Sequence, residues 1–147
     1  MSRTPEFAIV LVVLVAIAGC GGSGGTKSAT RRECTQLLAA VHSMGPVTSE
    51  LIAIPNSDAD ALHRVAYAEK TTKTVLHRIE KTSANGAVAK SRAQVLSALN
   101  KLSRQLLTAR IDLRTGRTQQ QKSQGYVQLS SGPLDAAQAA LIAACNR

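Results

Sequence analysis

Aromatic side chains are nearly absent from this chain of 147 residues, which has no tryptophan, one phenylalanine and two tyrosines. A hydrophobic core must therefore be built from leucine, valine, isoleucine and alanine. β-Sandwiches and β-barrels favour aromatic and β-branched residues, whereas small and straight-chain residues favour helices. The composition predicts an all-α fold.

Residues that carry chemistry are also scarce. The nine acidic residues and three histidines are scattered along the chain, whereas general acid–base catalysis needs side chains that converge. Metal sites in helical bundles use Glu-x-x-His pairs, and the nearest match here is the single pair Asp60 and His63. No Cys-x-x-Cys-His motif for haem attachment is present. We therefore expect no enzymatic activity, no metal site and no cofactor.

A membrane-spanning apolar run is missing as well. The uncharged segment from Phe7 to Gly19 is 13 residues long, and a spanning helix needs about 20. A charged start with Arg3, a short apolar core and small residues at its end are typical of a secretory signal. An ordinary secretory signal does not require a cysteine directly after the small residues.

The segment Ile17-Ala18-Gly19-Cys20 resembles the lipobox of bacterial lipoproteins, with isoleucine in the usual place of leucine. The resemblance is confined to the N-terminal signal. It implies that residues 1–19 are a signal peptide, that Cys20 carries acyl chains such as palmitate, and that the protein is anchored to a bacterial envelope membrane. Gly21 stands where an aspartate would resemble an inner-membrane retention signal. This favours the outer membrane in a diderm bacterium, and otherwise the outer face of the plasma membrane.

Two cysteines remain once Cys20 carries lipid, namely Cys34 and Cys145. An exported protein meets an oxidising compartment, in which such a pair forms a disulfide. Two free buried thiols are the alternative. Neither cysteine has a second cysteine or histidine at metal-ligand spacing, so we expect a disulfide and not a metal site.

Turn-forming residues divide the rest of the chain. Residues 20–28 read as the lipidated cysteine and a flexible Gly/Ser-rich linker, which leaves residues 29–147 as one domain. Breaks at 55–57, 85–86 and 115–116 then separate four segments of similar length. These are about 29–54, 58–84, 87–114 and 117–146. Four such segments joined by tight turns predict an up-down-up-down four-helix bundle.

Apolar spacing supports the four segments unevenly. The third has the clearest helical stripe, formed by Val95, Leu99, Leu102, Leu106, Ala109 and Leu113, and Leu107 is expected to widen it. Gly45-Pro46 must kink or interrupt the first segment, because proline removes a backbone donor. Pro133 suits the first turn of a new helix. Residues 115–132 can be read either as helix or as a long loop.

The predicted topology has a consequence for the cysteines. In an up-down bundle, the start of the first helix and the end of the fourth lie at the same end. Cys34 lies in the first turns of segment one, and Cys145 lies in the last turn of segment four. The bundle therefore places the two cysteines where they can meet.

Positive charge is the remaining signal, with a net charge of +9. It is either a solvated surface or a contact for an anionic partner. Nucleic acid does not suit an exported, lipid-anchored protein. Anionic envelope polymers, lipid head groups and acidic protein surfaces remain. The candidate basic face comprises Arg92, Lys101, Arg104, Arg110, Arg114 and Arg117.

A second group of basic residues belongs to the end of the bundle nearest the lipid. It comprises Lys27, Arg31, Arg32 and Lys90. Basic residues near an anionic membrane surface are attracted to it. We therefore expect this end to face the membrane.

The function predicted from these features is that of a membrane-anchored, non-enzymatic scaffold or binding module. A pilotin-like chaperone of an envelope assembly is one alternative, by analogy of architecture alone. An inhibitor or modulator of an envelope enzyme, acting through the basic face, is the other.

Overall fold

The computed structural model describes residues 24–115, 129 and 132–146, and within these ranges the regular structure is helical, without strands. The helices are α1 (Gly24–His42), α2 (Gly45–Ile52), α3 (Asp58–Lys81), α4 (Gly86–Arg114) and α6 (Pro133–Cys145).

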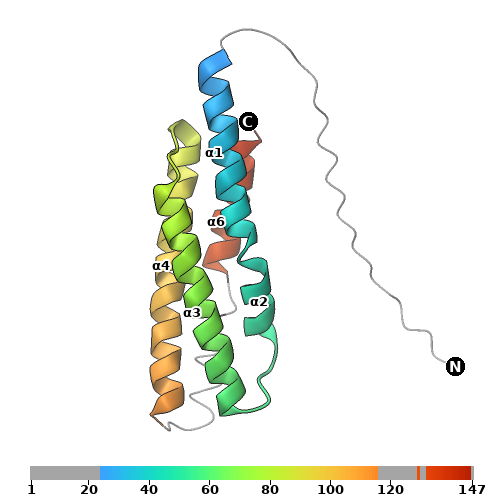
Figure 1. Cartoon of the computed structure of the whole chain (residues 1–147), viewed down its shortest axis with the longest axis vertical. Coiled ribbons are helices and arrows are strands. Elements are labelled where there is room, and N and C mark those ends of the chain that lie inside the picture. The colour runs from blue at the N-terminus through green and yellow to red at the C-terminus, as the bar shows by residue number, and fades with distance from the viewer. Residues whose placement is uncertain (1–23, 116–128, 130–131, 147) are drawn as a thin grey trace, which may run out of the picture.

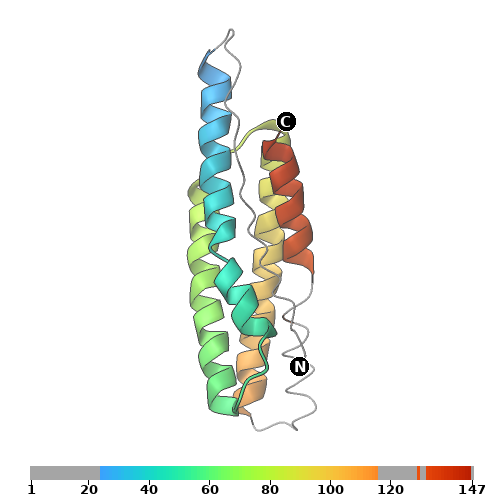
Figure 2. The same cartoon turned by 90° about the vertical axis from the view of Figure 1, so that its right-hand side faces the viewer.

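These helices run alternately along one long axis (Figure 1). α1 and α2 descend together, α3 returns, α4 descends beside α3, and α6 returns beside α4 (Figure 2). α4 contacts both α3 and α6, and α1 contacts α3 and α6 as well. The arrangement confirms the predicted all-α, up-down-up-down bundle.

The boundary between α2 and α3 follows from capping. The Ser57 hydroxyl accepts a hydrogen bond from the Asp60 amide at 3.1 Å, which satisfies one of the free amides of the first turn of α3. Asp58 and Asp60 lie in that first turn, and Arg78 and Lys81 lie in the last. Both pairs complement the helix dipole.

The break between α1 and α2 confirms the kink expected at Gly45-Pro46. α1 ends at His42, and α2 begins at Gly45 with Pro46 in its first turn. The proline needs no hydrogen-bonded amide there. The backbone bridges the break through Met44, whose amide donates to the Val41 carbonyl at 2.9 Å and whose carbonyl accepts from the Thr48 amide at 3.0 Å. The two helices therefore continue in one direction as a bent first column (Figure 2).

The core is built mainly along α4. All six residues of the stripe predicted for the third segment are buried, with Val95, Leu99 and Leu106 fully inaccessible. Leu107 does not widen this stripe as expected, because its side chain is 43% exposed. A step of one residue after Leu106 turns the side chain by about 100° around the helix, away from the core.

The N-terminal end of the predicted domain differs from expectation, and the C-terminal end agrees with it as far as the structure describes it. Residues 24–28, assigned to the flexible linker by composition, are helical, because α1 begins at Gly24. Adding a turn to an existing helix is easier than starting one, which explains how small polar residues join α1. α6 begins at Pro133 as predicted. Residues 116–128 and 130–131 lie outside the described ranges, so the choice between helix and loop there stays open.

A hydrogen bond between side chain and backbone joins α6 to α4, with the Ser91 hydroxyl donating to the Ala140 carbonyl at 3.2 Å. The turn before α6 uses Gly132, whose φ of 89° favours glycine. In the part of the chain that the structure describes, no helix combines the length and the apolar character needed to cross a membrane.

Candidate functional site

The disulfide end of the bundle contains the end of α3, the start of α4, the end of α6 and the middle of α1, whose first turns extend beyond the other helices (Figure 1). Cys34 and Cys145 form a disulfide there, with their Cα atoms 5.6 Å apart across a sequence separation of 111 residues. Cys34 is 6% exposed, so the bond lies against the core. The two cysteines meet where the up-down topology predicts.

Polar and charged residues also lie at this end of the bundle. Glu33, the residue before Cys34, is 9% exposed, and its Oε1 accepts a hydrogen bond from the Ser83 hydroxyl at 3.1 Å. That bond links α1 to the turn between α3 and α4. Arg31, Arg32 and Lys90 are exposed at the same end.

Some positions of the sequence prediction cannot be placed. Cys20 and Arg117 lie outside the described residues, and so does the side chain of Lys27.

Arg92 is part of the fold and not of an open basic face. Its Nε donates to the Ile79 carbonyl at 3.0 Å, and its Nη2 donates to the Glu80 carbonyl at 2.9 Å. These carbonyls belong to the last turn of α3, where a cation complements the dipole. Arg92 therefore ties the start of α4 to the end of α3.

Arg110 is also engaged by α3. Its Nη1 lies 2.7 Å from Oε2 of Glu69, and the Lys73 ammonium lies 2.8 Å from Oε1 of the same carboxylate. Glu69 is 7% exposed. The hydrogen bond from Lys73 lowers the pKa of the Glu69 carboxyl, burial opposes this, and the Arg110 charge adds to the lowering. Glu69 is therefore held ionised inside a three-member charge cluster.

The remaining basic residues of α4 divide between two other directions. Lys101 lies nine residues from both Arg92 and Arg110, which is about 2.5 helical turns and thus the opposite side of α4. It lines an open hollow between α4 and α6, in which half of the lining residues are alanine, among them Ala98, Ala137 and Ala140. Arg104 and Arg114 are exposed and lie between these two directions, since Arg104 follows Lys101 by three residues and Arg114 follows Arg110 by four. The described members of the predicted basic face therefore spread over about half of the circumference of α4, and two of them, Arg92 and Arg110, are engaged by α3.

An apolar pair lies between Arg104 and Arg114. Leu107 is 43% exposed and Ile111 is 51% exposed, one helical turn apart. We name the outer part of α4 formed by Arg104, Leu107, Arg110, Ile111 and Arg114 the distal α4 surface. Sequence reasoning missed it because Leu107 was assigned to the core. The signal that could have found it is the second spacing of 3, 4 and 3 residues from Arg104 to Arg114, beside the core stripe.

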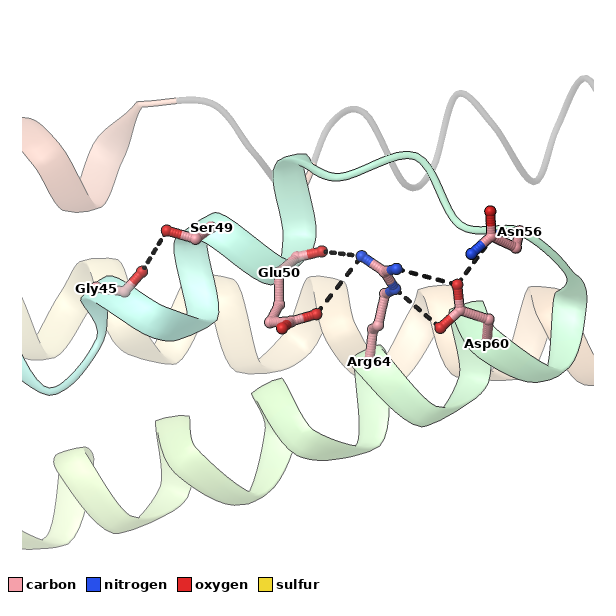
Figure 3. Close-up of polar contacts among 6 residues, drawn as sticks. All are labelled: Gly45, Ser49, Glu50, Asn56, Asp60 and Arg64. Carbon is pink, nitrogen blue, oxygen red and sulfur yellow. Dashed lines mark hydrogen bonds and ion pairs between the residues drawn. The ribbon is translucent and has the colours of Figure 1, made fainter. Parts of the chain in front are cut away.

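The turn between α2 and α3 is organised by Arg64 (Figure 3). Its Nε and Nη2 each donate to the Asp60 carboxylate at 3.0 Å, and its Nη1 donates to the Glu50 carbonyl at 3.1 Å. The backbone amide of Asn56 donates to the same carboxylate at 2.9 Å. The bonds from Arg64 and Asn56 lower the pKa of the Asp60 carboxyl. This network fixes a turn on which Ile54 is 89% exposed.

Metal ligands do not gather in the described part of the chain, where no three side chains of His, Cys, Asp or Glu form a group that could hold an ion. Comparison of the chain with models of protein families gives no match, and comparisons with curated proteins and with solved structures give none either.

Proposed function

We propose that this protein is a lipid-anchored, non-enzymatic helical binding module of a bacterial envelope. The observation that carries the proposal is that the two ends of the bundle differ in their features. The segment with the lipobox-like sequence leads into α1 at the disulfide end, and the distal α4 surface with its exposed Leu107 and Ile111 lies toward the other end. One end suits attachment, and the other suits contact with a partner.

The length of α4 separates these two roles. From Lys90 to Arg114 the helix rises about 36 Å at 1.5 Å per residue. A membrane at the disulfide end would leave the distal α4 surface well beyond the lipid head groups. Electrostatic attraction to the membrane fades within about 10 Å at ordinary salt, so the two ends can engage different partners.

The modulator alternative is weakened by the distribution of charge. Arg92 and Arg110 donate hydrogen bonds to α3, and Lys101 lies on the other side of α4 from both of them. The basic residues therefore offer no broad single surface for an acidic cleft. A helix-binding role, including a pilotin-like one, needs only a narrow stripe.

Attachment is tested by metabolic labelling with an alkyne-bearing palmitate in a bacterial host. We expect label on the full-length protein and its recovery with membranes. The Cys20→Ser variant should lose both, and the Ser23→Ala variant, three residues away, serves as the matched control. Equal labelling of the Cys20→Ser variant, or a mature protein that keeps residues 1–19, would contradict the proposed anchor.

A further inference from the structure

The distal α4 surface follows a single line along the helix. Arg104, Leu107, Ile111 and Arg114 are spaced by 3, 4 and 3 residues, the spacing that places side chains on one face. The line is about 15 Å long at 1.5 Å per residue. Isolated exposed apolar residues are ordinary on protein surfaces. Two of them one turn apart, with an arginine at each end, form an organised surface.

The charge of this surface is one-sided. Arg104 and Arg114 make no side-chain hydrogen bond or ion pair with another described residue. Arg110 and Lys73 flank the line, and the Glu69 carboxylate binds both of them. Since Glu69 is 7% exposed, its negative charge is largely covered, while the Lys73 side chain is 64% exposed. A partner meets mainly positive charge around an apolar centre.

We propose that the distal α4 surface binds an amphipathic helix of a partner protein, with acidic residues flanking that helix's apolar stripe. Leu107 and Ile111 insert between the apolar side chains of the partner, as in helix–helix packing. Arg104 and Arg114 pair with the partner's carboxylates. This inference rests on the proposed binding function and specifies its partner.

Two other occupants fit less well. A second copy of the chain would bring arginines against arginines, which is unfavourable. An anionic membrane would have to reach the end of α4 that lies away from the disulfide end, and a helix that binds in a membrane interface presents a larger apolar face than two residues.

The experiment uses the complete mature chain with Cys20→Ser, ¹⁵N-labelled and oxidised. The first probe is a synthetic amphipathic helical peptide with leucine at its core positions and glutamate beside them. The second probe is its twin with lysine in place of each glutamate. The third is a suspension of vesicles rich in phosphatidylglycerol. We expect the acidic peptide to shift the amide resonances of residues 103–115, and binding to weaken as salt rises.

Variants localise the contact. Leu107→Ala with Ile111→Ala, and separately Arg104→Glu with Arg114→Glu, should each weaken binding of the acidic peptide about tenfold or more. Ile142→Ala is the matched apolar control, since Ile142 is 42% exposed on α6. Lys90→Glu with Lys101→Glu changes the net charge by the same amount and is the matched charge control on α4. Circular dichroism and a thiol assay confirm that each variant is folded and oxidised.

The proposal fails if the lysine peptide binds equally well, if neither double variant weakens binding, or if no resonance of α4 moves. It also fails if the vesicles shift residues 103–115, because the surface would then be a membrane contact. The labelling of Cys20 is measured separately. If the protein is labelled at Cys20 but does not bind the acidic peptide, the proposed anchor stands and only the proposed helix partner is ruled out.

Discussion

At the scale of single residues, Glu69 shows how a polar interruption of a helical stripe is used. Glu69 and Thr72 interrupt the apolar pattern of segment two, and both are buried in α3. Glu69 is satisfied by Lys73, four residues away, and by Arg110, which is 41 residues away. A partner four residues away can be predicted from helical spacing. A partner on another helix depends on the packing of α3 against α4, which spacing alone does not determine.

Replacing Glu69 by glutamine should lower the free energy of unfolding by about 1–2 kcal/mol. The variant loses two charge-assisted hydrogen bonds, but the side chains of Lys73 and Arg110 are 64% and 33% exposed, so water compensates in part. Urea unfolding at pH 7 measures the change. Glu80→Gln on the exposed side of α3 is the control and should shift stability by less than about 0.5 kcal/mol.

The difference in unfolding free energy between wild type and Glu69→Gln is expected to depend on pH. The pKa of Glu69 is lowered in the folded protein from its ordinary value of 4.5, so its contribution is complete above that value and is lost as the pH falls through the folded pKa. The stability difference between wild type and Glu69→Gln should therefore shrink under acid. A difference that stays constant down to the acid transition would mean that the carboxylate charge contributes nothing.

At the scale of helices, the sequence predicted where helices break more accurately than how far each helix extends. Pro46, Ser57 and Pro133 each impose a local backbone requirement, and each lies in the first turn or cap of a helix. The extent of α1 was wrong by five residues because glycine and serine have weak preferences, which a neighbouring helix overrides. The distal α4 surface was missed for a related reason. Apolar periodicity identifies a helix but does not say which of two adjacent stripes faces the core.

α6 is a short helix whose last turn is covalently tied to α1. It is 13 residues long and buries Ala137 and Leu141. In the chain-entropy model, a disulfide closing a loop of roughly 100 residues contributes about 4.7 kcal/mol, and often less in practice. The double variant Cys34→Ser with Cys145→Ser should therefore lower the urea midpoint strongly. Amides of α6 should also exchange hydrogen faster, because this helix loses its tie to α1.

The reference protein for that comparison is Cys20→Ser, which keeps the disulfide and lacks the cysteine proposed to carry the lipid. Reducing this reference with dithiothreitol should reproduce the loss of stability seen in the double variant. If reduction leaves both the midpoint and the exchange of α6 unchanged, α6 is held by packing alone.

At the scale of the whole molecule, the topology followed from the positions of three turns. The meeting of Cys34 and Cys145 followed from that topology. The side of α4 on which each basic side chain lies could not be predicted from the turns. Although all three residues belong to α4, Arg92 points to α3, Lys101 points to the α6 side and Arg104 points outward. Net charge predicts attraction to anionic partners in general, and only the rotation of each helix decides where they bind.

The difference between the two ends of the bundle leads to a test of which end meets a membrane. Arg31, Arg32 and Lys90 are exposed at the disulfide end, and each basic residue near an anionic surface contributes about 1 kcal/mol. Replacing all three by glutamine in the soluble Cys20→Ser protein should weaken binding to phosphatidylglycerol vesicles about 100-fold. Co-sedimentation at about 0.1 M salt measures this binding, because the Debye length of about 10 Å there lets an anionic surface sense mainly the nearest charges.

The matched control removes the same amount of charge elsewhere, through Lys101→Gln, Arg104→Gln and Arg114→Gln. Lys101 is the nearest of the three to Lys90 and lies about 16 Å along α4 from it, beyond the Debye length of about 10 Å at 0.1 M salt. We therefore expect the control to bind vesicles nearly as well as the reference protein. Equal losses in the two triple variants would show attraction by net charge without orientation. A larger loss in the control would place the membrane at the distal end, against both the proposed anchor geometry and the proposed helix partner.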